Sequence, residues 1–203
     1  MKNFIWLYLL AICMSACTGD ISTENSTTEE IDFEPILIEE EAEELEVEEP
    51  EPVFKPNIEM VEGVPVYNKF DDIEYLFHQH TDTTYVINFW ATWCKPCVEE
   101  LPYLEKLNKE YQDEKVKVIL VSMDFKKLIH HKLTPFLEKN AIQSDVVLLA
   151  DGYTSTWIDR VSNKWDGAIP YSIIYRNDEK QELGIAESYN DIESIVKEFL
   201  KTS

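Results

Sequence analysis

The stretch Val86-Ile-Asn-Phe-Trp-Ala-Thr-Trp-Cys-Lys-Pro-Cys97 decides the fold of this chain. Its first half is apolar and rich in β-branched and aromatic residues, which favours a buried strand. Its second half is a C-x-x-C motif, and apolar residues follow it at helical spacing: Leu101, Leu104, Leu107 and Tyr111. The stretch therefore predicts a strand that runs into a helix, with two cysteines at the start of that helix.

The two cysteines of this motif are suited to thiol chemistry. Cysteines three apart at a helix start lie on one face, within disulfide range, and the free N–H groups and positive dipole there stabilise a thiolate. Cys94 is thus predicted to be an acidic, exposed nucleophile. Cys97, one turn further in, is suited to attack the mixed disulfide and release the substrate. Lys95 adds positive charge, and Pro96 fits a first turn because its missing N–H would be unpaired there.

A zinc site and a structural disulfide are the two other interpretations of this motif. Zinc needs further cysteine or histidine ligands, but the sequence has no second C-x-x-C and its 4 histidines show no matching spacing. A structural bridge that closes so short a loop would restrict the unfolded chain little. We therefore expect redox chemistry without a metal. We also expect no cofactor, since neither G-x-G-x-x-G nor C-x-x-C-H occurs.

The stretch Phe89-Trp-Ala-Thr-Trp-Cys-Lys-Pro-Cys97 resembles the active site of the thioredoxin superfamily, and specifically that of the TlpA/ResA-type thiol-disulfide oxidoreductases. A second mark is Trp165-Asp-Gly-Ala-Ile-Pro170, which precedes the strand-like Tyr171-Ser-Ile-Ile-Tyr175. In that family a cis-proline precedes a sheet strand and faces the cysteine pair, and Pro170 is the matching position. The resemblance implies that Ile169 presents its backbone to a bound substrate strand. An ordinary trans turn proline is the alternative.

Two further positions refine this resemblance. TlpA/ResA-type proteins are similar to this chain in having an asparagine at the position of Asn88 and a glutamate at that of Glu100. A carboxylate near Cys97 would accept its proton if partial burial raised the carboxyl pKa toward neutrality. Glu100 is therefore the predicted general base, and an exposed surface glutamate like Glu99 is the alternative. Tyr171 departs from the family pattern, in which a threonine commonly follows the cis-proline.

The tryptophans of the motif are predicted to be structural rather than a cofactor platform. We expect Trp90 in the core and Trp93 at the rim of the active site. The residues that we expect to contact substrate are Trp93, Lys95, Pro96, Ile169 and Pro170.

The remaining sequence alternates strand and helix patterns. The expected elements are strands over 116–123 and 146–150, a helix that Thr134 caps, an edge strand over 181–187, and a last helix that starts at Asn190 with Glu193 as a capping box. With the early segment 53–79, they predict an α/β domain over residues 53–203. The resemblance implies that this domain has the thioredoxin-like fold, a central mixed β-sheet flanked by helices on both faces.

The charge of the chain is strongly uneven. Over 203 residues, 18 basic and 40 acidic residues give a net charge of -22, which argues against a nucleic-acid partner because phosphate binding needs a clustered basic surface. Thr18 to Glu62 contains 17 acidic residues and one basic residue. Like charges at adjacent and i,i+4 positions disfavour a helix, so we expect residues 17–52 to be a disordered, solvated tether. A specific binding role for this acidic run is the alternative.

Residues 1–16 have the features of a lipoprotein signal peptide. The apolar run from Phe4 to Met14 is too short to span a bilayer, and Ser15-Ala-Cys17 resembles a lipobox, in which cleavage precedes a lipidated cysteine. Cys17 is thus the expected membrane anchor. An ordinary secretory signal or a short uncleaved anchor is the alternative, and export is implied either way. The resemblance to envelope lipoproteins implies that an inner-membrane retention signal would have aspartate where Thr18 stands, which slightly favours the outer membrane in a Gram-negative cell.

These features together predict a lipid-tethered thiol-disulfide oxidoreductase of the cell envelope, facing the periplasm or the exterior. The resemblance implies that it reduces disulfides of exported proteins, apocytochromes c included, and that a membrane thiol electron donor regenerates its dithiol. The alternative is a non-catalytic lipoprotein that uses the fold as a redox switch or for metal delivery. Copper-handling relatives of thioredoxin tend to carry C-x-x-x-C, whereas this chain has the two-residue spacing.

Overall fold

The computed structural model describes residues 56–151 and 155–201. The predicted signal peptide, Cys17 and the predicted tether lie outside the described residues, as does the predicted start of the domain at residue 53. The strands are β1 (Ile58–Val61), β2 (Val64–Tyr67), β3 (Thr84–Trp90), β4 (Val116–Ser122), β5 (Asp145–Leu149), β6 (Tyr171–Arg176) and β7 (Glu179–Leu183). The α-helices are α1 (Phe70–Ile73), α2 (Lys95–Glu110), α3 (Thr134–Lys139), α4 (Ile158–Val161) and α5 (Tyr189–Lys201).

The strands form one mixed sheet in the order β1-β2-β5-β4-β3-β6-β7. β2, β5, β4 and β3 are parallel, whereas β6 runs antiparallel to β3, and the β1–β2 and β6–β7 pairs are antiparallel hairpins. Strands β3 and β4 lie in the middle and are buried along almost their whole length. This burial on both faces explains why their sequences are nearly continuous apolar runs.

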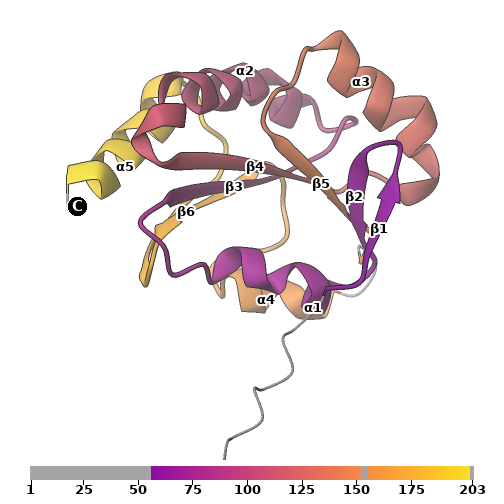
Figure 1. Ribbon diagram of the computed structural model, residues 1–203, viewed down its shortest axis with the longest axis horizontal. Helices are drawn as coiled ribbons and strands as arrows, with labels where there is room; N and C mark the ends of the chain where they lie inside the picture. Colours follow the sequence, from indigo (N-terminus) through magenta and orange to yellow (C-terminus); the bar gives the residue numbers. More distant parts are fainter. Residues whose placement is uncertain (1–55, 152–154, 202–203) are drawn as a thin grey trace, which may run out of the picture. The chain divides into compact units, whose positions relative to one another are not determined.

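Helices cover both faces of the sheet, which gives a three-layer α/β domain (Figure 1). Helices α2, α3 and α5 lie on one face, and α1 and α4 lie on the other. The core accordingly has two halves. One contains Leu104, Leu120 and Val196, and the other is rich in aromatic side chains, with Phe89 stacked 6.0 Å from Trp157 between ring centroids. The predicted thioredoxin-like fold, a mixed sheet flanked by helices on both faces, is confirmed.

The predicted cap at Thr134 is wrong. The chain is already helical before this residue, through a 3₁₀ turn (Lys126–Leu128) and a π-helical turn (Ile129–Leu133). Thr134 itself has helical backbone angles, and its buried hydroxyl has no hydrogen-bond partner among the described residues. The completely buried side chains of Ile129 and Leu133 anchor the preceding turns in the core, so tertiary packing overrides the local capping signal.

The last helix and the edge strand also differ in detail from the sequence-based expectation. Helix α5 begins at Tyr189, and the Asp191 carboxylate accepts a hydrogen bond from the Ser188 backbone N–H at 2.7 Å, so Asn190 and Glu193 do not form the predicted capping box. The edge strand β7 ends at Leu183 rather than extending past Gly184. Both differences are shifts of an element boundary, which local sequence patterns define poorly.

Truncating the buried face of α2 should destabilise this fold. Leu104 has no exposed surface, so Leu104→Ala should lower the free energy of unfolding by about 2–5 kcal/mol through lost burial and a residual cavity. Urea denaturation followed by circular dichroism measures this change. The control is Ile185→Ala, because Ile185 is 59% exposed and its truncation should cost less than about 0.5 kcal/mol. Equal effects of the two substitutions would contradict this account of the core.

Candidate active site at the Cys94–Cys97 disulfide

The cysteine motif lies where β3 passes into α2. Cys94 is the residue directly before the helix, in an extended conformation, and its sulfur accepts a hydrogen bond from the Cys97 backbone N–H at 3.3 Å. Pro96 occupies the first helical turn, where its missing N–H leaves no intrahelical bond unmade. The predicted strand-to-helix junction with two cysteines at the helix start is confirmed.

Cys94 and Cys97 form a disulfide, with their Cα atoms 5.3 Å apart. Cys97 is completely buried, and only 6% of the surface of Cys94 is exposed to solvent. Cys94 is therefore the more accessible sulfur, but it is much less exposed than the sequence analysis expected. The reason is the segment before β6, whose Ile169 carbonyl oxygen lies 3.6 Å from the Cys94 sulfur.

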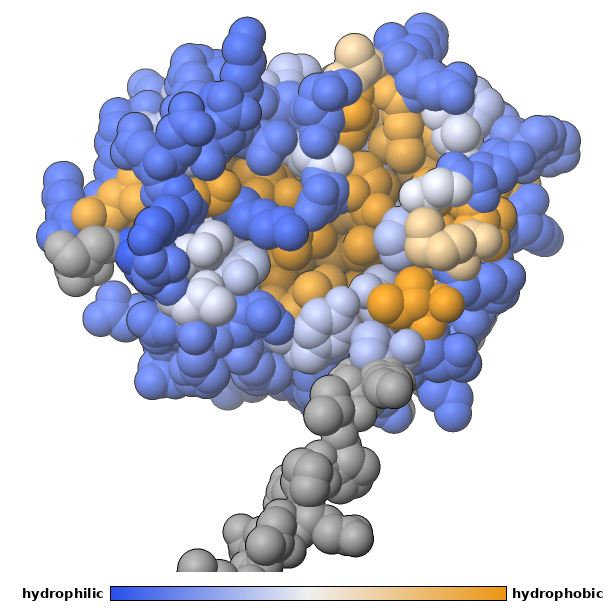
Figure 2. Space-filling view, viewed as in Figure 1, coloured by the Kyte–Doolittle hydropathy of each residue, from blue (hydrophilic) through white to orange (hydrophobic). Residues whose placement is uncertain are grey.

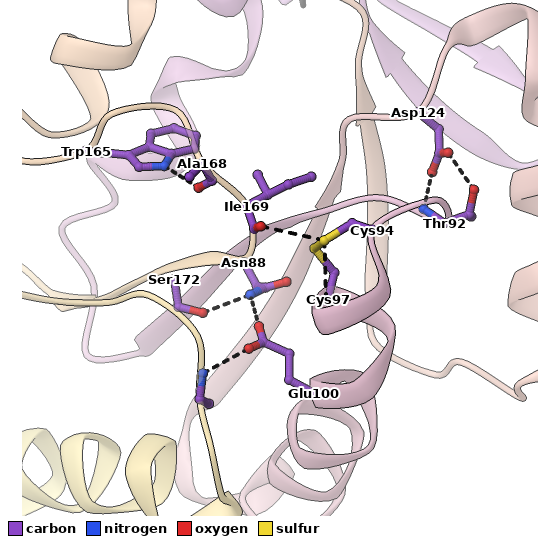
Figure 3. Close-up of a disulfide and its surroundings, with 11 residues drawn as sticks. Asn88, Thr92, Cys94, Cys97, Glu100, Asp124, Trp165, Ala168, Ile169 and Ser172 are labelled. Carbon is purple, nitrogen blue, oxygen red and sulfur yellow. Dashed lines mark hydrogen bonds between the residues drawn. A yellow bond between two sulfur atoms is a disulfide. The ribbon is translucent and has the colours of Figure 1, made fainter.

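The Ile169–Pro170 peptide bond is cis, as expected from the resemblance. This peptide directly precedes β6, which pairs with β3, so the Ile169 carbonyl faces the disulfide from the neighbouring strand (Figure 3). A disulfide sulfur has no proton, so the contact between the Cys94 sulfur and the Ile169 oxygen is a hydrogen bond only when Cys94 is a thiol.

Glu100 lies on the buried side of α2 and is only 1% exposed. Its Oε1 atom accepts a hydrogen bond from the Asn88 side-chain amide at 2.7 Å, and its Oε2 atom accepts one from the Ala186 backbone N–H at 3.1 Å. The Asn88 amide also donates to the Ser172 hydroxyl at 2.9 Å. The carboxylate, one helical turn from Cys97, thus joins β3, β6 and the loop before α5 (Figure 3). The alternative of an exposed surface glutamate is wrong.

Burial raises the pKa of Glu100 to about 7, although the hydrogen bonds from Ala186 and Asn88 act in the opposite direction. The effect of desolvation on the pKa is larger than that of the hydrogen bonds, because an ionised carboxylate in an apolar surrounding loses its hydration. A carboxyl group with a pKa near neutrality can both accept and release a proton at physiological pH. This is the property that the sequence analysis required of a general base.

The other motif residues divide into core, rim and surface. Trp90 is completely buried and packs 5.5 Å from Phe136 between ring centroids, whereas Trp93 is 61% exposed at the rim. The predictions for these two tryptophans are confirmed. The Lys95 ammonium lies 3.6 Å from the carboxylate of Glu99, so part of its charge is balanced on the helix surface.

An open groove of about 660 Å³ is lined by Trp93 and by Ile169, whose carbonyl oxygen meets the Cys94 sulfur. Its lining also includes aromatic and charged residues: Phe125, Trp157, Trp165, Asp124, Lys126 and Lys127. Figure 2 shows how apolar residues come to the surface in the middle of one face, surrounded by polar ones. The groove brings together two of the predicted substrate-contacting residues.

Three residues around this site were missed by the sequence analysis. Ser172 lies opposite Asn88 only because of the antiparallel register of β3 and β6, which no local pattern reveals. Ala186 contributes a backbone N–H, so its side chain carries no signal. Asp124 had a usable sequence signal, because it is a polar residue just after the buried strand β4. A residue there lies at the edge of the sheet where the parallel neighbour β3 also ends.

Residues 56–151 and 155–201 contain neither a cluster of potential metal ligands nor a membrane-spanning helix. In that part of the chain, no three or more histidine, cysteine, aspartate or glutamate side chains lie together as metal ligands would. Nor does any helix there combine the length and the apolar character needed to cross a membrane.

The model of the AhpC/TSA family matches residues 68–180, which is more than half of the chain. The chain belongs to the AhpC/TSA family. The matched range includes both cysteines, Glu100 and the cis-proline.

Among curated proteins, the chain is similar to the thiol-disulfide oxidoreductase ResA of Oceanobacillus iheyensis, with 46% identity over 22% of this chain and 23% of the relative. It is 55% identical to the thioredoxin-like protein YneN of Bacillus subtilis over 20% of this chain and 22% of that protein. It is 35% identical to ResA of Geobacillus thermodenitrificans over 38% of this chain and 44% of that protein. The chain thus spans less than half the length of these relatives.

Among solved structures, the fold is similar to a thiol:disulfide interchange protein from Chlorobium tepidum, with a TM-score of 0.49 and 22% identity over 59% of this chain and 81% of that one. It is also similar to a thioredoxin-like protein from Porphyromonas gingivalis, with a TM-score of 0.46 and 25% identity over 61% of this chain and 79% of that one.

The raised pKa of Glu100 predicts a pH-dependent stability. Its folded-state pKa of about 7 lies above the ordinary 4.5, so the neutral carboxyl stabilises the folded chain below pH 4.5, and this contribution is lost as the pH rises through 7. Glu100→Gln cannot ionise. Its free energy of unfolding relative to wild type should therefore rise across this range by up to about 3 kcal/mol.

Urea denaturation of the oxidised wild type and variant between pH 4 and 8 measures this difference. Glu99→Gln is the matched control, because Glu99 is exposed on the same helix and its replacement should leave the pH dependence of wild type unchanged. A difference between Glu100→Gln and wild type that stays constant with pH would contradict the role given to burial.

Proposed function

We propose that this protein is a thiol-disulfide oxidoreductase that reduces disulfides of exported proteins through Cys94 and Cys97. The observation that carries the proposal is the Cys94–Cys97 disulfide at the start of α2, with the Cys94 sulfur 3.6 Å from the carbonyl oxygen that precedes a cis-proline. The names of the ResA relatives from Oceanobacillus and Geobacillus support it. A pair that can open and close reversibly is what disulfide exchange requires.

In the first step the Cys94 thiolate attacks one sulfur of the client disulfide. A new bond joins Cys94 to that sulfur, the client disulfide breaks, and the other client sulfur leaves as a thiolate. The Cys97 backbone N–H, 3.3 Å from the Cys94 sulfur, and the N-terminus of α2 stabilise the negative charge on Cys94 before attack. The remaining exposed surface of Cys94 supports its role as the sulfur that a client meets first.

In the second step the Cys97 thiolate attacks Cys94 and breaks the mixed disulfide. The second client sulfur leaves as a thiolate, and the two electrons of the dithiol have passed to the client. Cys97 must lose its proton before it attacks, and it is completely buried, so water cannot reach it freely. Glu100 accepts this proton as a general base, since its pKa of about 7 makes proton transfer possible near neutral pH.

The client segment binds in an extended form beside the cis-proline. The Ile169 backbone offers it a carbonyl, and Pro170 holds that carbonyl toward Cys94. The exposed ring of Trp93 and the groove next to it provide apolar contact area. Pro96 and Lys95 complete the surface around Cys94 on the helix side, where the Lys95 side chain is largely exposed.

The proposed cellular setting rests on the N-terminal sequence. After cleavage of residues 1–16, lipid on Cys17 would anchor the protein, and the acidic residues 17–52 would hold the catalytic domain away from the membrane. The domain then acts in the cell envelope, facing the periplasm or the exterior, with the outer membrane slightly favoured. A membrane thiol electron donor must return two electrons to the Cys94–Cys97 pair. Apocytochromes c are one class of client with cysteines that need reduction.

A non-catalytic lipoprotein that uses the same pair as a redox switch or for metal delivery is the alternative function. This alternative can be tested because it predicts no catalytic turnover of disulfides. The reversible pair itself is compatible with both functions.

Insulin reduction tests the proposed catalytic function. The full-length chain in detergent, supplied with dithiothreitol, should accelerate the precipitation of reduced insulin B chains, and Cys94→Ser should abolish this acceleration because no nucleophile remains. Turbidity at fixed enzyme concentration is the measurement. Absence of Cys94-dependent turnover, together with tight copper(I) binding, would favour the alternative function. Cys97→Ser that has been reduced and then freed of dithiothreitol should stay joined to its client through a Cys94 mixed disulfide, which mass spectrometry without reduction identifies.

The pH dependence of insulin reduction tests the role of Glu100. Glu100→Gln cannot accept the proton of Cys97, so turnover should fall by about tenfold or more near neutral pH, while the fold stays intact by circular dichroism. Glu99→Gln again serves as the control on the exposed side of the helix and should keep the wild-type profile. Unchanged rates of Glu100→Gln across pH 5–9 would remove this residue from the mechanism.

A further inference from the structure

The carboxylate of Asp124 is buried beside the segment that leads into Cys94. Asp124 is 2% exposed, and its Oδ1 atom accepts a hydrogen bond from the Thr92 hydroxyl at 2.6 Å. Its Oδ2 atom accepts hydrogen bonds from the Thr92 backbone N–H at 3.0 Å and from the Ser122 hydroxyl at 2.9 Å. Figure 3 shows the two carboxylate oxygens directed at the main chain and the side chain of Thr92.

These bonds continue the connection between β3 and β4 beyond the end of the sheet. The last paired residues of the two strands are Trp90 and Ser122, and one further backbone bond runs from the Met123 N–H to the Trp90 carbonyl at 2.7 Å. Strand pairing ends there, so no carbonyl of β4 accepts from the Thr92 N–H. The Asp124 carboxylate accepts this hydrogen bond instead. Hydrogen bonds to an ionised acceptor are roughly twice as strong as neutral ones.

The position of Thr92 in turn determines where the Cys94 sulfur lies. Cys94 follows two residues later, and its backbone N–H donates to the Ala91 carbonyl at 3.1 Å, which closes a tight turn around Thr92. At the end of this turn, the Cys94 sulfur meets the Cys97 N–H at 3.3 Å. A shift of Thr92 would therefore move the sulfur away from the N–H group that stabilises its thiolate.

The importance of the hydrogen bonds between Asp124 and Thr92 depends on the redox state of the Cys94–Cys97 pair. In the disulfide form described here, the covalent bond to Cys97 holds Cys94 against α2. Once the pair is reduced, that bond is gone, and only the backbone conformation at Cys94 and non-covalent contacts keep its sulfur at the helix start. The dithiol is also the form that attacks a client. Misplacing a reacting atom by about 1 Å can cost about 10²-fold in rate.

We propose that Asp124 is a positioning residue, whose paired hydrogen bonds to Thr92 hold the Cys94 thiolate at the start of α2 after the disulfide has opened. This role rests on the proposed oxidoreductase function and adds to it. Burying a carboxylate costs free energy unless hydrogen-bond donors surround it. Asp124 has three such donors: the backbone N–H and hydroxyl of Thr92, and the hydroxyl of Ser122. Asp124 touches neither sulfur, so it acts through Thr92.

Thr92→Val and Thr92→Ser form the matched pair that tests this proposal in the full-length chain. Valine has the shape of threonine but removes the hydroxyl that donates to Asp124 and leaves the backbone N–H in place, whereas serine keeps the hydroxyl. The readout is the pH profile of Cys94 alkylation in the reduced protein, followed by mass spectrometry on the peptide that carries Cys94. Thr92→Val should shift the ionisation midpoint of Cys94 toward the value of about 8.5 of free cysteine, and Thr92→Ser should restore the wild-type midpoint.

Insulin reduction provides a second readout. Thr92→Val should lower the rate by about tenfold, as expected for the loss of one charge-assisted hydrogen bond. Asp124→Asn should also lower it, and the double variant should be no slower than the slower single variant, because both changes act on the bond between the Thr92 hydroxyl and the Asp124 carboxylate. Circular dichroism of the oxidised proteins checks that the variants are folded.

The proposal is overturned if folded Thr92→Val keeps the wild-type Cys94 midpoint, if Thr92→Ser is as impaired as Thr92→Val, or if the two single effects simply multiply in the double variant. The Cys94 midpoint separates this result from a failure of the proposed function. If wild type reduces no insulin, the oxidoreductase function is wrong, and the alkylation profiles of the Thr92 variants still decide whether Asp124 positions Cys94.

Discussion

The direct passage from a buried central strand into a helix is the constraint on which the rest of this structure depends. Strand β3 is paired on both sides, by β4 and β6, and ends at Trp90, and only four residues separate it from helix α2, which starts at Lys95. The end of β3 cannot move without disturbing the core, so the first turn of α2 is held in place as well. Cys94 therefore meets unpaired helix N–H groups at a fixed position, and its chemistry follows from that position.

A second consequence of this junction is that one helix presents two opposite environments within two turns. Cys94 retains some exposure at the start of α2, whereas Glu100 is buried and has donors from β3 and from the loop before α5. The exposed end suits attack on a client, and the buried carboxyl suits proton transfer to or from a group that water cannot reach. Burial of an acid costs stability, and the Asn88 and Ala186 donors offset only part of it, which is why the pKa stays near 7.

The helix boundaries show where local signals fail. Thr134 followed by a proline has the pattern of a helix start, yet the buried side chains of Ile129 and Leu133 make the chain helical earlier. Cys94 shows the same limit at the active site, because its exposure depends on Ile169, which lies 75 positions away in the chain and packs against its sulfur. In both cases a long-range contact overrides what the neighbouring residues favour.

The sequence by itself determined the strand-to-helix junction and the cysteine pair, because both follow from residues that are close together in the chain. The cis-proline at Pro170 and the layered thioredoxin-like architecture were instead implied by the resemblance of two short motifs to a known family. Only the tertiary structure decided how the site is completed. The register of β3 and β6 brings Ser172 to Asn88, the loop before α5 brings the Ala186 N–H to Glu100, and the end of β4 brings Asp124 to Thr92. These contacts join residues far apart in sequence, so their partners are chosen by how the strands and helices pack and not by any local pattern.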